Sequence, residues 1–185
     1  MNNISYLITD PKYYSQNSTK LKKVFNYASD RHFINIACLR DKKNQNVKSL
    51  AKSFLYITKK RKIFSILNSH IDLAYFLGFD GVHLPSNMVE KTKIAKRKKL
   101  FVIVSCHSLE EIKKAEQLKA DMVTFSPVFY SPDKGKPKGL KKLRRVVFKS
   151  KIPIIALGGI VSKKQIHKIK LRKAVGFASI RYFVK

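Results

Sequence analysis

The chain has 185 residues, of which 44% are hydrophobic, and this suits a single globular domain over residues 1–185 with a substantial core. Its 40 lysines and arginines against 11 aspartates and glutamates give a formal net charge of +29, which favours anionic ligands. No apolar run approaches the roughly 20 residues of a membrane helix, and two cysteines are too few for a disulfide framework. We therefore expect a cytoplasmic protein with no membrane partner.

The first half of the chain alternates short apolar runs with amphipathic stretches. Strands are predicted at residues 4–8 (ISYLI), 33–39 (FINIACL), 63–67 (IFSIL) and 82–84 (VHL). Between them, apolar residues recur at helical spacing over residues 21–28, 47–55 and 71–75, and Gly78 ends the third of these helices. A polar helix is expected at residues 86–97.

The same alternation continues to the end of the chain. Strands are predicted at residues 100–104 (LFVIV), 121–125 (DMVTF), 152–157 (IPIIAL) and 174–180. Two of the following helices should open with a capping box, Ser108 with Glu111 and Ser162 with Gln165. The loop at residues 126–139 is the longest in the chain, and loops of that length are usually functional.

Eight strand signals alternating with seven helix signals favour an α/β fold, a compact (β/α)8 TIM barrel whose last outer helix is missing or very short. An open doubly wound sheet is the alternative, but it needs a glycine-rich turn after the first strand, where this chain has ITDPKYY. Without a full last helix, apolar barrel surface should be left near Tyr182 and Phe183. We expect a partner subunit, as in a homodimer, or a rearranged helix to cover it.

In such a barrel the active site lies where the strands end. Cationic and neutral hydrogen-bond donors follow the predicted strands, as expected for phosphorylated ligands. Gly158 and Gly159 stand between the seventh strand and a helix N-terminus, where backbone N–H groups favour a phosphate and no Cβ blocks a ligand. The candidate donors are Arg40, Lys42, Lys134, Arg181, Asn68, Ser105 and Ser131, with Ser179 at the end of the last strand.

The sequence gives less support to acid–base catalysis, a cysteine nucleophile, a metal site or nucleic-acid binding. His83 and His107 follow strands and are candidates for an acid or base, although a structural hydrogen-bonding role is as common there. Cys38 and Cys106 lack an obvious activating partner. No metal site is predicted, because no cluster of His, Asp and Glu has ligand spacing. The lysines are spread along almost every predicted helix with few aromatics among them, which disfavours a nucleic-acid partner.

Four motifs in order resemble the thiamine phosphate synthase/TenI family over almost the whole chain. They are DGVHLP (residues 80–85), VSCHS (104–108), FSPVFYSPDKGKPKGL (125–140) and ALGGI (156–160). The resemblance implies a transferase of thiamine biosynthesis that joins hydroxymethylpyrimidine diphosphate to thiazole phosphate and releases pyrophosphate.

The resemblance also implies roles for residues at matching positions. Arg40, Lys42 and Asn68 would bind the diphosphate substrate, and Gly158 with Gly159 would bind the thiazole phosphate. Ser105, Ser131 and Lys134 would lie near the leaving group, with Ser105 and Lys134 as the catalytic candidates.

At several positions this chain departs from the family pattern. The two aspartates that hold magnesium in the synthases are replaced by Ser69 and by Met88 or Asn87, so any Mg2+ is expected to arrive on the substrate. The histidine typical of the thiazole tautomerases is Pro127. The family serine near the end of strand eight is Arg181, and the Gln of the diphosphate motif is Cys38. The alternatives are a TenI-like tautomerase or a non-catalytic protein that binds thiazole phosphate or thiamine phosphate.

Overall fold

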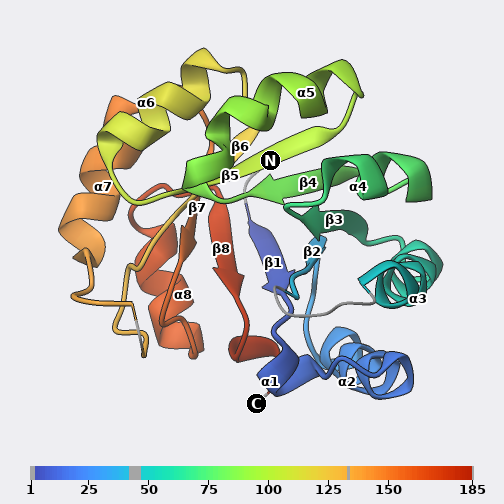
Figure 1. The fold of residues 1–185 in the computed structure, drawn as a ribbon. Coiled ribbons are helices and arrows are strands. Elements are labelled where there is room, and N and C mark those ends of the chain that lie inside the picture. The colour runs from blue at the N-terminus through green and yellow to red at the C-terminus, as the bar shows by residue number, and fades with distance from the viewer. Residues whose placement is uncertain (1–2, 42–46, 133, 185) are drawn as a thin grey trace.

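The computed structural model describes residues 3–41, 47–132 and 134–184. Eight parallel strands close into a barrel in sequence order, each paired with its neighbours and β8 with β1 (Figure 1). This confirms the predicted TIM barrel and excludes the open sheet. The strands are β1 (Ile4–Ile8), β2 (Ile36–Leu39), β3 (Phe64–Asn68), β4 (Gly81–Leu84), β5 (Phe101–Cys106), β6 (Met122–Phe125), β7 (Ile154–Leu157) and β8 (Gly176–Ser179).

Helices surround the barrel because each connects two parallel strands. The connections are α1 (Pro11–Tyr14) with α2 (Ser18–Arg31), α3 (Val47–Lys60), α4 (Ile71–Leu77), the 3-10 helix η1 (Ser86–Lys91) with α5 (Thr92–Arg97), α6 (Leu109–Gln117), α7 (Gly139–Lys149) and α8 (Lys163–Lys170). The expected helix at residues 86–97 is thus a 3-10 turn followed by a short α-helix. No described helix is both long and apolar enough to cross a membrane.

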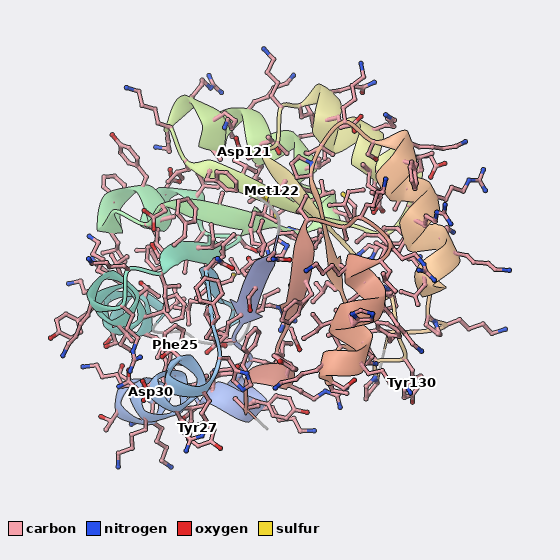
Figure 2. All side chains as sticks on the ribbon, turned by 180° about the vertical axis from the view of Figure 1, so that it is seen from behind. Phe25, Tyr27, Asp30, Asp121, Met122 and Tyr130 are labelled. Atoms are coloured by element: carbon pink, nitrogen blue, oxygen red, sulfur yellow. The ribbon has the colours of Figure 1, made fainter. Side chains whose placement is uncertain are left out.

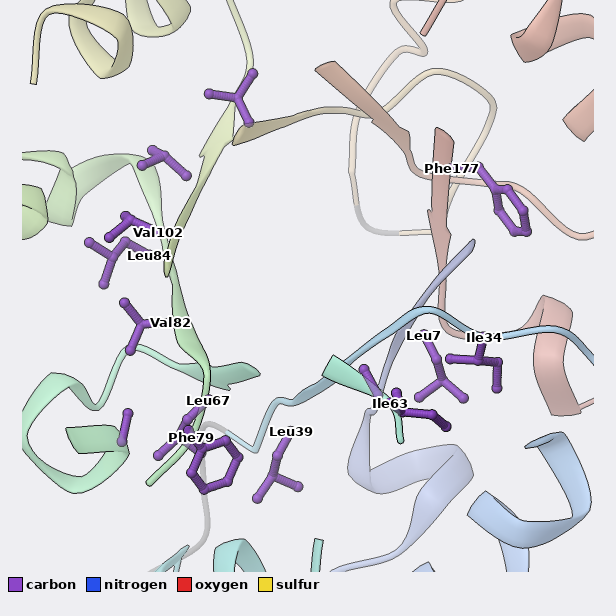
Figure 3. Packing of buried hydrophobic residues seen from close by; sticks show 14 of the residues in the cluster. Leu7, Ile34, Leu39, Ile63, Leu67, Phe79, Val82, Leu84, Val102 and Phe177 are labelled. Carbon is purple, nitrogen blue, oxygen red and sulfur yellow. The ribbon is translucent and has the colours of Figure 1, made fainter. Parts of the chain in front are cut away.

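Two apolar layers hold the barrel together. One lies inside it, where Ile4, Tyr6 and Ile8 of β1 meet residues such as Ile66 and Ile103. The other lies between the outer face of the strands and the helices, and Figure 3 shows part of it, with Leu7, Leu67 and Val82 on the strands and Phe79 beside them. Because both faces of each strand are buried, the strands read as nearly continuous apolar runs in the sequence.

The segment after β8 is a single 3-10 turn, η2 (Tyr182–Val184). This agrees with the prediction that the last outer helix is missing or very short. Phe183 is fully buried and its ring stacks on that of Phe177, so this residue covers the barrel and leaves no apolar surface of its own. A cavity of about 390 Å3 remains next to Tyr182 and Phe177, between α8 and the segment that follows α2, with Ile166 and Ile169 among its lining residues. The predicted partner subunit stays a prediction.

Two aromatic residues lie elsewhere than the sequence predicts, one before a strand and one on the outer side of a helix. Phe33 is 76% exposed and precedes β2, which begins at Ile36. Tyr75 is 51% exposed, whereas Ile71 and Ala74 bury the inner side of α4. Figure 2 shows side-chain nitrogen atoms around the outline of the molecule, as expected from lysines on nearly every helix.

Candidate active site at the carboxyl ends of the strands

Four predicted site residues lie on the neighbouring strands β2 to β5 or directly after them. Arg40 follows β2, and Asn68 ends β3 opposite His83 of β4 in the register of the two strands. Ser105 lies on β5, and its Oγ is 2.9 Å from Nε2 of His83. The barrel therefore brings Arg40, Asn68, His83 and Ser105 together into one polar arc. We use this name for these four residues below.

Most of the other residues inside the barrel on the opposite side of this end are apolar. Ile8 of β1, Leu157 of β7 and Ile180 after β8 belong to the inner apolar cluster. The mouth thus has a polar half on β2 to β5 and a mainly apolar half on β7, β8 and β1, beyond which the charged residues Asp10 and Arg181 follow β1 and β8. Such an asymmetric wall suits a ligand with a charged group at one side and an uncharged ring at the other.

Arg40 is the cation of the polar arc and is held by a neighbouring carboxylate. Its Nη1 is 2.8 Å from Oδ2 of Asp10, which follows β1, and both side chains are about one-quarter exposed. The backbone N–H of Arg40 also donates to Oγ1 of Thr9 at 2.9 Å. The guanidinium is therefore oriented before any ligand binds, and it keeps further N–H groups for an anion.

His83 is a buried and neutral member of the arc. Burial first, and the positive charge of Arg40 second, lower the pKa of His83 from 6.5 to about 3. Its Nδ1 is 3.0 Å from the hydroxyl of Tyr6, so both ring nitrogens have partners. A histidine that stays unprotonated and fully engaged is suited to hydrogen bonding more than to proton transfer.

Tyr6 is a polar member of this site that the sequence analysis did not single out. It is fully buried inside the barrel, and burial together with Cys38 raises its pKa well above the usual value. The only sequence signal is a tyrosine among the aliphatic residues of ISYLI. Thr124 of β6 was also missed, and its Oγ1 lies 3.5 Å from Nε2 of His83.

The two cysteines are free and buried, as predicted. Burial raises the pKa of Cys38 to about 12, although a hydrogen bond from Tyr6 and the charge of Arg40 act in the opposite direction. Burial likewise raises the pKa of Cys106 to about 12. Neither thiol is activated as a nucleophile.

The glycine pair after β7 packs against the loop after β6. A Cβ on Gly158 would lie 2.6 Å from Cα of Pro127, and one on Gly159 would lie 2.2 Å from the carbonyl oxygen of Tyr130. Backbone hydrogen bonds from Val128 to the Leu157 carbonyl and from Phe129 to the Gly158 carbonyl hold the two segments together. The space that we expected the glycines to leave for a ligand is therefore taken by the chain's own loop.

This packing places part of the long loop beside the glycines. Ser131 directly follows Tyr130, whose carbonyl touches Gly159, whereas Lys134 is exposed further along the loop. Lys42 lies outside the described residues. The phosphate-binding role of Gly158 and Gly159 stays a prediction that concerns their backbone N–H groups.

The remaining candidates have partners within the protein. Ser179 is buried, its Oγ donates to the Ile160 carbonyl at 2.7 Å, and it accepts from the N–H of Tyr182. It thus ties the loop after β7 to β8, and its predicted substrate contact is untested. His107 is exposed, and its Nδ1 is 3.0 Å from the Ser126 carbonyl.

The helix after the glycine pair begins as the capping pattern predicted. Oγ of Ser162 accepts from the backbone N–H of Gln165, and Oε1 of Gln165 accepts from the N–H of Val161. Nε2 of Gln165 also donates to the Gly159 carbonyl at 3.0 Å. The cap therefore fixes the glycine loop to α8 as well as starting the helix.

Of the residues at the positions where the resemblance implies magnesium aspartates, Ser69 and Met88 lie in one cavity, whereas the alternative Asn87 is not among its lining residues. Ser69 and Met88 both line a space of about 420 Å3 at the ends of β3 and β4, together with Asp72 and Lys91. Asp72 is already paired with Lys98 at 3.2 Å. Within residues 3–41, 47–132 and 134–184, no group of three or more His, Cys, Asp or Glu side chains could hold a metal ion.

Comparison with known proteins shows the family to which this chain belongs. A family model described as thiamine monophosphate synthase (TMP-TENI) matches residues 5–183. A putative thiamine-phosphate synthase 2 from Aquifex aeolicus is 36% identical over 186 residues, which is 97% of both chains. A thiamine-phosphate synthase from Fusobacterium nucleatum is 30% identical, over 95% of this chain and 84% of that protein.

A solved structure agrees with the sequence relatives. A thiamine phosphate pyrophosphorylase from Pyrococcus furiosus superposes with a TM-score of 0.83 at 25% identity, covering 96% of this chain and 85% of that one. Barrels of less than 16% identity, such as an N-acetylmannosamine-6-phosphate 2-epimerase from Clostridium perfringens with a TM-score of 0.76, share the fold alone.

Proposed function

Because the chain belongs to the thiamine monophosphate synthase (TMP-TENI) family, we propose that it joins hydroxymethylpyrimidine diphosphate to thiazole phosphate and releases pyrophosphate. The observation that carries the proposal is the family match over residues 5–183, within which the polar arc lies at the ends of β2 to β5. The sequence relatives reported above are named thiamine-phosphate synthases, so the tautomerase and carrier alternatives are not favoured.

In this proposal the polar arc binds the diphosphate. Arg40, oriented by Asp10, supplies the cation, Asn68 supplies an amide, and Ser105 supplies a hydroxyl near the leaving group. Lys134 and Lys42 are proposed to complete the positive charge around the departing oxygens, and Ser131 to add a hydroxyl donor. The thiazole phosphate would meet the backbone N–H groups of Gly158 and Gly159, and its ring the apolar half of the mouth.

The chemistry that this implies needs no proton transfer. The bond between the pyrimidine methylene carbon and the diphosphate oxygen breaks, and the diphosphate leaves with the electron pair. The lone pair of the thiazole nitrogen then forms the new bond to that carbon. Because no proton is gained or lost at the reacting atoms, a neutral His83 that serves only as a hydrogen-bonding group suits the reaction, and donors aimed at the leaving oxygens lower its barrier.

Magnesium is the metal that the family implies, and the described residues do not fit a protein-held ion. A hard cation takes carboxylate and carbonyl oxygens. The polar side chains of the cavity at the ends of β3 and β4 are instead a hydroxyl, a thioether, a lysine and the imidazole of His70, and its one carboxylate, Asp72, is paired with Lys98. We therefore propose that any magnesium in the reaction comes bound to the diphosphate of the substrate.

The test is to incubate the purified protein with both substrates and magnesium and to measure thiamine phosphate by chromatography. Product should form with the wild-type protein and should fall at least about tenfold with Ser105→Ala, the loss expected for one hydrogen bond to a charged group. Ser150→Ala is the matched control, because Ser150 precedes β7 at the other end of the barrel and its hydroxyl has no partner among the described residues. No product from the wild-type protein would refute the proposal.

A further inference from the structure

A row of hydrogen-bonded side chains crosses the barrel interior from β1 to β5. The hydroxyl of Tyr6 is 3.0 Å from Nδ1 of His83, and Nε2 of His83 is 2.9 Å from Oγ of Ser105. The thiol of Cys38 on β2 is close enough to the Tyr6 hydroxyl to raise its pKa, and it is the remaining member of the row. Cys38 and Tyr6 are fully buried, and His83 is 3% exposed. Ser105 is the outermost member and the only one that is half-buried, so the row ends at the mouth.

The polar side chains of this row are unexpected, because the residues around them inside the barrel are aliphatic. Tyr6, Cys38, Ile66 and Ile103 belong to the same inner cluster. A phenylalanine in place of Tyr6 would keep the ring and remove the need to satisfy a buried hydroxyl. A buried polar group costs free energy unless it is hydrogen-bonded, so this tyrosine is expected to have a role that phenylalanine lacks.

Oγ1 of Thr124, at 3.5 Å from Nε2 of His83, is too distant to compete with Oγ of Ser105 at 2.9 Å. With these partners, the hydrogens in the row have two self-consistent arrangements. In one, Tyr6 donates to Nδ1 of His83, and Nε2–H of His83 donates to Ser105, whose own hydrogen is then free. In the other, Nδ1–H donates to Tyr6, Tyr6 donates to the sulfur of Cys38, and Ser105 donates to Nε2 and offers only lone pairs. A phenol is a better donor than a thiol, and an imidazole nitrogen is a better acceptor than sulfur, which favours the first arrangement.

We propose that Tyr6 is a positioning residue that fixes His83 in the Nε2–H tautomer, so that Ser105 presents its hydroxyl hydrogen to the departing diphosphate. This inference rests on the proposed synthase function for its last step only. The charge of Arg40 supports it, because a cation near the imidazole disfavours a second proton on that ring and keeps one nitrogen as an acceptor for Tyr6. Tyr6 thereby acts on the substrate through two other side chains.

The tautomer can be read directly in the wild-type protein. Two-bond 1H–15N correlation spectra of uniformly labelled protein distinguish a protonated from an unprotonated ring nitrogen, and His83→Gln identifies the signals among the five histidines. We expect His83 to be neutral with the hydrogen on Nε2. A hydrogen on Nδ1 would overturn the proposal whatever the enzymatic activity.

The functional step is tested with Tyr6→Phe. This change should lower kcat about tenfold, since Ser105 then loses its orientation as a donor. The control is Tyr14→Phe, which removes a hydroxyl from another fully buried tyrosine that donates to the Ile180 carbonyl at 3.0 Å. It should leave kcat close to the wild-type value at a similar cost in stability.

A double variant separates positioning from a general loss of structure. If Tyr6 acts through Ser105, Tyr6→Phe should add little to the loss already caused by Ser105→Ala. Additive losses, or equal kcat values for Tyr6→Phe and Tyr14→Phe, would contradict the proposal.

Binding of inorganic pyrophosphate tests the proposal without requiring the protein to catalyse a reaction. Titration calorimetry should show weaker binding to Tyr6→Phe and Ser105→Ala than to Tyr14→Phe, and unchanged binding would contradict the proposal. If the wild-type protein makes no thiamine phosphate, the synthase function fails, while the spectra and the titration still decide whether Tyr6 positions Ser105.

Discussion

Gly159→Ala should destabilise the protein strongly, because the site of the new methyl group is already occupied. The new Cβ would lie 2.2 Å from the Tyr130 carbonyl oxygen and 2.7 Å from the Phe129 carbonyl carbon, and both are backbone atoms that cannot rotate away. Gly159 also has φ of +68°, a left-handed conformation that costs an L-residue about 1–2 kcal/mol. Displacing packed backbone adds about 1–3 kcal/mol. We expect a total loss of about 3 kcal/mol.

The measurement is urea unfolding followed by circular dichroism, with a thermal melt as a second reading. For a protein of this size about 3 kcal/mol corresponds to a decrease in Tm of roughly 6–12 °C. Gly135→Ala is the matched control, because Gly135 has φ of +67° but no atom within 4 Å of its Cβ position, so it shares the backbone strain without the collision. Equal losses for the two variants would refute the argument that the glycine loop and the β6 loop are packed together.

Three further predictions concern stability. Burial alone would raise the pKa of Glu116, but hydrogen bonds from Lys113, Ile152 and Lys151 lower it. E116Q should therefore be less stable than the wild type at neutral pH. The difference in urea unfolding should shrink as the pH falls below about 4.5, because the wild-type carboxylate is then protonated. The pKa of His83 is about 6.5 in the unfolded chain and about 3 in the folded protein. Between roughly pH 6.5 and 3, His83 is therefore protonated in the unfolded chain and neutral in the folded one. Stability in urea should thus decrease on acidification by up to about 1.4 kcal/mol per pH unit in this window, and H83Q should flatten the curve. F183A should lose about 3–5 kcal/mol in the same assay because it empties a fully buried site, and a loss below 1 kcal/mol would show that the C-terminal turn does not seal the barrel.

The barrel could be predicted from sequence because its strands are buried on both faces. Runs such as LFVIV and IPIIAL have no polar alternation, and short turns and amphipathic segments separate them. Strand limits were less predictable, since an apolar run does not say where pairing begins. FINIACL contains Phe33, which is mostly exposed, and β2 pairs only from Ile36.

The polar arc was predictable for a topological reason. Once the strands close in sequence order, the residues after them must meet at one end, so Arg40, Asn68, His83 and Ser105 converge without any contact being known. The hydroxyl of Tyr6 was beyond this reasoning, because its partner His83 is 77 positions away and lies inside the barrel. No local pattern marks such a pair.

The contacts of the glycine pair, Gly158 and Gly159, were also beyond prediction from sequence, because they involve residues distant in the chain. The sequence indicates correctly that a side chain is excluded after β7, but it does not say what excludes it. The excluding atoms belong to Pro127 and Tyr130, which approach through the fold of a loop about 30 residues earlier in the chain.

The base of the β6 loop is fastened from both sides. Backbone N–H groups of Lys138 and Gly139 bond back to the carbonyls of Pro127 and Val128, and the residues before Tyr130 are locked on the glycine pair. The exposed residues between these two attachments, Pro132 and residues 134–137, can therefore be exchanged with little effect on the barrel beneath them. Changes in this part of the chain are decoupled from the stability of the fold.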